Sequence, residues 1–122
     1  MLERIKKYNQ VYIHNIDQKE LLKYYYNAKV HAIVSWYETP GLSSLEAACG
    51  GCNIVSTDRG STMEYFGKDA TYCDPFSEES IISAVNKAML AHSSAKLRAK
   101  IMEKYNWNGA AQDTIKGYNR IV

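Results

Sequence analysis

The sequence comprises 122 residues, of which 46% are hydrophobic and 23% charged, and its net charge is +2, as is typical of one globular domain. This balance gives no case for a nucleic-acid-binding protein. No stretch approaches the about 18 to 20 consecutive apolar residues of a membrane-spanning helix, and the N-terminus lacks the apolar centre of a signal peptide.

Strands alternate with helices along the chain, and this order predicts an α/β fold with a parallel sheet flanked by helices. Apolar runs rich in β-formers predict four short strands, at 10–16, 30–34, 53–57 and 70–73. Helical periodicity and capping patterns predict helices at 17–28, 43–49, 61–66, 77–89 and 93–105, and a last helix after a break at 106–109. Because a doubly wound domain often has about five or six strands, we expect one or two strands of a longer protein to precede this segment.

The stretch from Glu38 to Glu46 is the most informative part of the chain, because it follows a strand, contains Gly41 and enters a helix. A strand, a glycine-bearing loop and a helix N-terminus form the geometry that binds phosphate in open α/β sheets. We expect unpaired amides at residues 42–44, where the helix dipole favours an anion by about 0.3–1 kcal/mol. Carboxylates accept the hydrogen bonds that sugar hydroxyls donate, so two acids beside an anion site indicate a sugar ligand.

Each of these side chains also has a simpler interpretation. Ser43 and Glu46 have the spacing of a capping box, so Glu46 could serve only its own helix. A single loop glutamate such as Glu38 is more often solvated than functional. Arg59, in the loop after the next strand, could reach an anion, although such an arginine is more often simply exposed.

The three cysteines, an odd number, argue against a disulfide framework and favour a reducing compartment. Cys49 and Cys52 form a Cys-x-x-Cys pattern, which invites a zinc or redox interpretation. Zinc needs about four ligands and no second pair is present. A redox pair lies at a helix N-terminus, whereas this one lies where a helix ends. We therefore predict core cysteines, with Gly50-Gly51 as the helix cap, and no metal site.

Four further side chains are singled out by type. His31 lies in a predicted strand, and we interpret it as a packed histidine in preference to a base. Trp36 and Tyr37 could stack on a ligand ring or pack the loop. Trp107 is predicted to anchor the last helices.

With these residues assembled, the chain resembles the C-terminal domain of the group-one retaining glycosyltransferases, which have two Rossmann-like domains. The family carries two glutamates separated by seven residues, and Glu38 and Glu46 match them. Four further positions of the family motif are matched by Gly41, Leu42, Leu45 and, directly after the second glutamate, Ala47. Segments 20–28, 46–55 and 60–65 resemble the flanking family motifs in the right order, so the resemblance spans nearly the whole chain. Thr39-Pro40 departs from the usual Gly-Phe of the family.

The resemblance implies a Rossmann-like parallel sheet that forms one half of a two-domain type-B glycosyltransferase fold. It implies that Glu38 is the catalytic residue, which orients the donor sugar and stabilises charge, and that Glu46 accepts hydrogen bonds from the ribose. The other implied donor-binding positions are Ser35, Gly41, Leu42 and Ser43. A sugar would pass from a nucleotide-diphosphate sugar to a glycan or glycolipid with retained anomeric configuration, as in polysaccharide biosynthesis. No metal or other cofactor is expected, because the helix N-terminus stabilises the departing diphosphate.

The resemblance also implies that residues 1–122 are a single nucleotide-sugar-binding domain, preceded in a longer protein by an acceptor-binding domain. We expect the 122 residues alone to be inactive and to bind donor weakly, because the family's basic pair for the phosphates lies upstream. The class implies a cytoplasmic location. Residues 1–29 and 92–122 are basic, which we interpret as solvated helix faces, with peripheral contact at the inner face of a membrane as the alternative.

Two other functions stay open at this point. A receiver-like signalling domain, which is a non-enzymatic binding module, would use Asp58 as its phosphoacceptor, but Asp17 is the only other strand-end acid that could help to hold Mg²⁺. A transferase-like domain that serves only assembly is the third interpretation.

Overall fold

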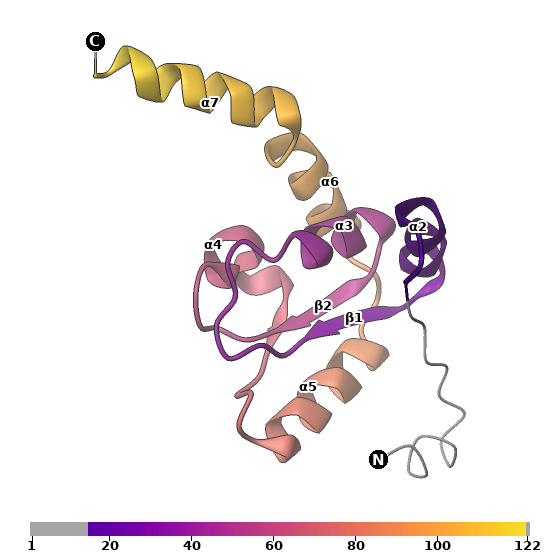
Figure 1. Cartoon of the computed structure of the whole chain (residues 1–122). Helices are drawn as coiled ribbons and strands as arrows, with labels where there is room; N and C mark the ends of the chain where they lie inside the picture. The colour runs from indigo at the N-terminus through magenta and orange to yellow at the C-terminus, as the bar shows by residue number, and fades with distance from the viewer. Residues whose placement is uncertain (1–14, 122) are drawn as a thin grey trace.

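The computed structural model describes residues 15–121 of the chain, and these residues form strands and helices in alternation (Figure 1). The strands are Val30–Ile33 (β1), Asn53–Ser56 (β2) and Thr71–Tyr72 (β3). The helices are Gln18–Asn27 (α2), Leu42–Gly50 (α3), Thr62–Phe66 (α4), Glu78–Leu90 (α5), Ala95–Lys104 (α6) and Trp107–Asn119 (α7), with a 3-10 turn at Gly67–Asp69 (η1).

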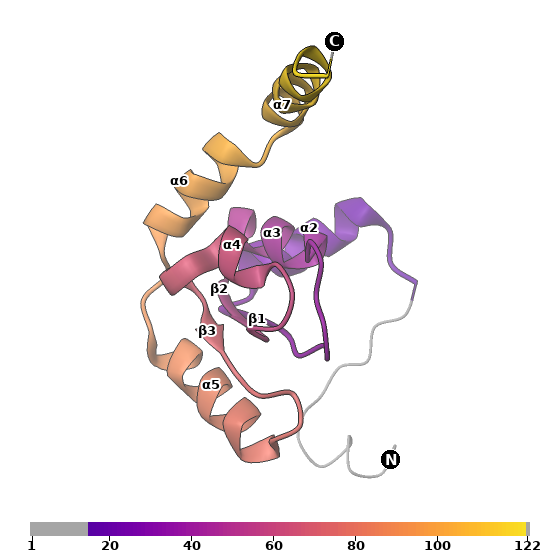
Figure 2. The ribbon, with the colours of Figure 1, turned by 90° about the vertical axis from the view of Figure 1, so that its left-hand side faces the viewer.

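The sheet has the strand order β1-β2-β3, and both neighbouring pairs are parallel. Helices α2, α3 and α4 lie over one face of the sheet and α5 covers the other, so the sheet and these four helices form three layers (Figure 2). This arrangement confirms the predicted α/β fold with a parallel sheet. Every residue of β2 is buried, as expected for a strand with neighbours on both sides and helices on both faces.

Alternate residues of β2 pack into two separate hydrophobic cores, one on each face of the sheet. Ile54 packs under the helices of the first face with a cluster of fully buried side chains, Ala47, Ala48, Phe66, Leu97 and Ile101. Val55 points to the other face and packs with Cys73, Ala84 and Ala88. Strand side chains alternate between faces, and this alternation explains how one short strand supports both layers.

The structure confirms most predicted elements and corrects two. The predicted strand at 10–16 lies outside the described residues, apart from its last two. The predicted break between the last two helices is present but shorter than 106–109. Helix α6 ends at Lys104, and the Asn106 side chain accepts a hydrogen bond from the Gly109 N–H (2.9 Å) and so caps a helix that begins at Trp107. Asp17 caps α2 through the Glu20 N–H (2.9 Å), as predicted. The capping box predicted at Ser61 is wrong, because the Ser61 backbone is not in the extended conformation of a capping residue.

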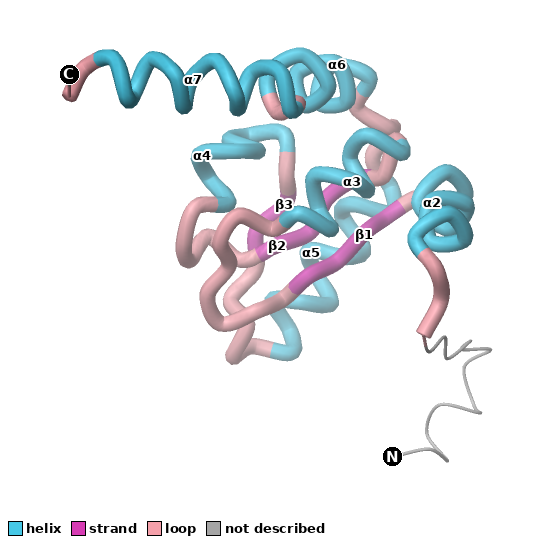
Figure 3. Tube along the Cα trace, turned by 45° about the horizontal axis from the view of Figure 1, so that its top comes forward, coloured by secondary structure: helices cyan, strands magenta, loops and turns pink. Residues whose placement is uncertain are grey.

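Helix α7 extends away from the sheet layers, as the views in Figures 1 and 3 agree. Its first residue, Trp107, is 92% exposed, so the prediction that this ring anchors the last helices is wrong. Within residues 15–121, no helix combines the length and the apolar character that crossing a membrane requires.

A short backbone bridge joins the loop after β1 to the loop after β2. The Glu38 N–H donates to the Arg59 carbonyl (3.2 Å), and the Ser61 N–H donates to the Glu38 carbonyl (3.0 Å). Gly60, between these two partners, has φ +97, and a Cβ at this position would collide with the Glu38 backbone. The bridge therefore requires glycine at position 60.

We predict that Gly60→Ala lowers the free energy of unfolding by at least about 1 kcal/mol, because alanine strains the positive φ and displaces the Glu38 backbone. Denaturant unfolding measures this loss. Gly117→Ala is the matched control, since a Cβ on Gly117 meets nothing within 4 Å and alanine favours a helix such as α7. Equal stability of Gly60→Ala and the wild type would contradict the requirement.

Candidate functional site

The candidate site lies at the carboxyl ends of β1 and β2, where the loops 34–41 and 57–61 meet. In an open parallel sheet the carboxyl ends share one edge, and ligands bind in the crevice outside it. The backbone bridge to Gly60 holds Glu38 in this edge, and the Glu38 side chain is partly buried. Ser35, two residues after β1, is also partly buried.

Gly41 begins α3 in the left-handed conformation, with φ +65 and ψ 50. A Cβ on this glycine would lie 3.4 Å from Cγ of Glu38 and 3.9 Å from its Oε1. The Glu38 carboxylate therefore lies beside the first residue of the helix N-terminus, as the sequence predicted. Glycine serves both the positive φ and the close approach of the glutamate.

The first turn of α3 presents fewer free amides than predicted. The Ser44 and Leu45 N–H groups both donate to the Gly41 carbonyl, at 2.9 and 3.1 Å. The expectation of an unpaired amide at position 44 is therefore wrong, because the turn closes on Gly41. Within residues 15–121, the amides of Gly41, Leu42 and Ser43 have no such partner, and these are three of the predicted donor-binding positions.

Glu46 does not serve as a helix cap. Helix α3 begins at Leu42 with Gly41 as its cap, so Ser43 and Glu46 both lie inside the helix and make no capping hydrogen bond with described residues. The capping-box interpretation of Glu46 is therefore wrong. The Glu46 side chain instead lines a groove of about 590 Å³ between α3 and the helices α2, α6 and α7.

The groove brings together residues that the sequence analysis did not connect. Its lining includes several aromatic side chains, Tyr25, Tyr26, Tyr65, Tyr105 and Trp107. It also includes one cation, Lys104 on α6, and two acids, Glu46 on α3 and Asp113 on α7. Glu38 is not part of this lining, so the two glutamates of the motif do not share this groove. A volume of this size is in the usual range for a small-molecule site.

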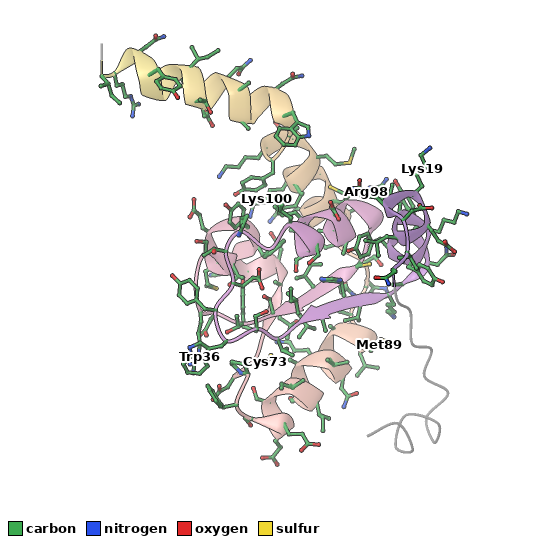
Figure 4. All side chains as sticks on the ribbon, viewed as in Figure 1. Lys19, Trp36, Cys73, Met89, Arg98 and Lys100 are labelled. Carbon is green, nitrogen blue, oxygen red and sulfur yellow. The ribbon has the colours of Figure 1, made fainter. Side chains whose placement is uncertain are left out.

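Arg59 is engaged with neighbouring side chains. Its guanidinium carbon lies 3.8 Å from the centre of the Trp36 ring, and its Nη2 is 3.4 Å from Oδ1 of Asp74. Trp36 packs edge-on against Phe76, with the ring centres 4.2 Å apart. Figure 4 shows Trp36 at the loop edge of the molecule, on the side away from α2. Of the interpretations of Trp36, these contacts favour loop packing.

The Cys-x-x-Cys pair belongs to the core. Cys52 is buried, and its thiol donates to the carbonyls of Tyr25 (3.2 Å) and Ala28 (3.4 Å). Burial raises the pKa of the Cys49 and Cys52 thiols, the opposite of what a redox cysteine needs. Gly51 ends α3 with φ +99, as predicted for the cap. Among residues 15–121, no group of three or more His, Cys, Asp or Glu side chains could hold a metal ion.

The chain is similar to known proteins in both sequence and structure. The sequence model of the family described as "Glycosyl transferases group 1" matches residues 1–106. A curated protein named "Probable sucrose-phosphate synthase" from Thermosipho melanesiensis is 30% identical, over 93% of this chain and 28% of that protein. A solved sucrose-phosphate synthase from Thermosynechococcus elongatus matches 98% of this chain and 33% of its own, with a TM-score of 0.80 and 21% identity.

The two matches cover nearly all of this chain but only part of each relative. The chain spans about a third or less of the length of both relatives. The structural likeness shows that the chain has the fold of one part of a type-B glycosyltransferase. The family motif expected from Glu38 and Glu46 lies inside the matched range.

His31 in β1 is packed, as the sequence analysis favoured. Its ring meets Tyr25 edge-on, with ring centres 5.7 Å apart, and its Nε2 is buried with no hydrogen-bond partner among the described residues. Burial lowers the pKa of this imidazole below its ordinary value of 6.5, because a proton on the ring would be poorly solvated.

We predict that His31 makes stability depend on pH. Below about pH 6.5 the unfolded chain binds a proton that native His31 resists, so the free energy of unfolding falls as the pH falls through 6.5. Denaturant unfolding at pH 8, 7, 6 and 5.5 measures this slope. In His31→Gln the slope over this window should be shallower, whatever the absolute stability. Parallel pH profiles of the two proteins would show that another group carries the dependence.

Proposed function

The chain belongs to the group 1 glycosyltransferases, and from this premise we propose that it is the donor-binding domain of a retaining enzyme. The enzyme moves a sugar from a nucleotide-diphosphate sugar to an acceptor. The observation that carries the proposal is the arrangement at α3, where the partly buried Glu38 lies beside a helix N-terminus with free amides and the partly buried Glu46 lies on the same helix. The family match favours this function over the receiver-like alternative.

Each part of the donor has a proposed partner. The amides of Gly41, Leu42 and Ser43 bind the diphosphate, because unpaired N–H groups and the positive end of the helix dipole favour an anion. Glu46 accepts hydrogen bonds from the ribose hydroxyls, and Glu38 accepts them from the donor sugar near the reacting carbon. Ser35, on the loop after β1, is a further proposed donor-binding residue.

The chemistry follows from where charge develops. As the bond between the sugar and the diphosphate breaks, negative charge grows on the leaving phosphate and positive charge on the sugar ring. The helix N-terminus stabilises the first charge, and the Glu38 carboxylate stabilises the second. We propose that no metal ion is needed, because fixed amide dipoles already oppose the growing negative charge.

In this proposal, binding of the acceptor requires residues other than those of this chain. We propose that a glycan or glycolipid acceptor is held by a further domain, and that residues 1–122 alone do not complete transfer. Both relatives are named as sucrose-phosphate synthases, so a small phosphorylated sugar stands beside these acceptors as a second candidate. A cytoplasmic location, with or without peripheral membrane contact, belongs to the same proposal.

We predict that Glu46→Gln in the full-length protein raises KM for the nucleotide-sugar donor by roughly 10- to 100-fold, because hydrogen bonds to a charged acceptor contribute about 1.5–3 kcal/mol. Glu38→Gln should lower kcat more than it changes KM, since its charge matters most in the transition state. Release of nucleoside diphosphate measures both constants. NMR of the product shows whether the anomeric configuration is retained.

Glu79→Gln on α5 is the matched control, because it removes the same charge on the opposite face of the sheet. This variant should leave both constants within twofold of the wild type. If Glu46→Gln and Glu79→Gln behave alike, the ribose contact is wrong. An unchanged transfer rate in both Glu46→Gln and Glu38→Gln would instead favour a domain that serves only assembly.

A further inference from the structure

One side chain, Arg59, ties together the loops that follow all three strands. Its guanidinium lies on the Trp36 ring of the loop after β1, at 3.8 Å from the ring centre. It also meets Asp74 (3.4 Å) and the Phe76 ring (5.7 Å) in the loop after β3. Arg59 itself belongs to the loop after β2. Arg59 therefore connects the three loops at the carboxyl edge of the sheet, and we call this set of contacts the brace.

The partners of Arg59 are themselves held in place. Oδ1 of Asp74 accepts a second hydrogen bond from the Phe76 N–H (3.1 Å), and the Asp74 N–H donates to Oγ of Ser80 at the start of α5 (3.0 Å). The Arg59 N–H donates to Oγ1 of the fully buried Thr57 (3.2 Å). The brace is therefore anchored to the ends of β2 and α5.

Arg59 reaches Glu38 by two routes. Its carbonyl accepts the hydrogen bond from the Glu38 N–H, and its side chain covers Trp36, two residues before Glu38. The loop 34–41 is thus held at Trp36 and at Glu38 itself. The guanidinium is half-exposed, so the ion pair and the stacking add little to global stability. Their main effect is to fix the position of the loop 34–41.

We propose that Arg59 is a positioning residue, which holds Glu38 where it meets the donor sugar. This inference rests on the proposed function of Glu38. Because Asp74 and the Trp36 ring already engage its charge, we assign Arg59 a positioning role in preference to donor binding. Displacement of a reacting group by about 1 Å can cost about 100-fold in rate, so a loosened loop lowers kcat more than it weakens binding.

The test uses the full-length protein and measures kcat and donor KM for Arg59→Ala and Arg59→Lys. Arg59→Ala should lower kcat about tenfold or more and leave KM within twofold. Arg59→Lys should fall between the two, because lysine keeps a charge for Asp74 but lacks the planar group that stacks on Trp36. Arg98→Ala, an exposed position on α6 labelled in Figure 4, is the control and should change neither constant beyond twofold.

A double-mutant cycle with Glu38→Gln separates positioning from a general loss of structure. If Arg59 acts through Glu38, Arg59→Ala should change kcat less than twofold in the Glu38→Gln background. An equal loss in both backgrounds, or a loss confined to KM, overturns the inference. If Glu38→Gln abolishes turnover while Arg59→Ala is fully active, only this inference fails. If Glu38→Gln itself has wild-type activity, both the proposed role of Glu38 and this inference are wrong.

Discussion

The bridge between Glu38 and Gly60 is the contact on which the candidate site depends. It continues the parallel pairing of β1 and β2 beyond the ends of both strands, after the chain has already turned into loops. Two hydrogen bonds contribute little to the free energy of unfolding, but they fix the backbone of Glu38, which lies beside the start of α3. Without them, Glu38 would belong to a loop of eight residues, 34–41, whose conformation local propensity leaves undetermined.

The second acid is held by a different kind of support. Glu46 lies on a helix whose far end is pressed against α2, because a Cβ on Gly50 would come within 3.0 Å of the Tyr25 side chain and backbone. Cys52 adds a thiol contact to the Tyr25 carbonyl, and Ala47 and Ala48 of the same helix are fully buried. The position of Glu46 therefore follows from close core packing.

How much of this could be predicted from the sequence depends on the range of each interaction. Local patterns predicted β1, β2, α2, α3 and the helix cap at Gly51, because strand period and glycine conformation act within a few residues. The pairing of Gly41 with Glu38 was also predictable, since both lie in one short loop. The chemical roles assigned to Glu38 and Glu46 came from the family resemblance and stay predictions.

Contacts between distant segments could not be predicted in this way. The partners of Arg59 lie 23 residues before it, at Trp36, and 15 residues after it, at Asp74, and no periodicity relates the three. The groove beside Glu46 likewise joins α3 to α6 and α7, so Lys104 and Trp107 had no local signal. The two acids thus rest on supports of different range: a loop braced by exposed side chains, and a helix set in the core. Substitutions in the loops after the strands therefore act on the position of Glu38, whereas substitutions in the core beneath α3 act on the position of Glu46.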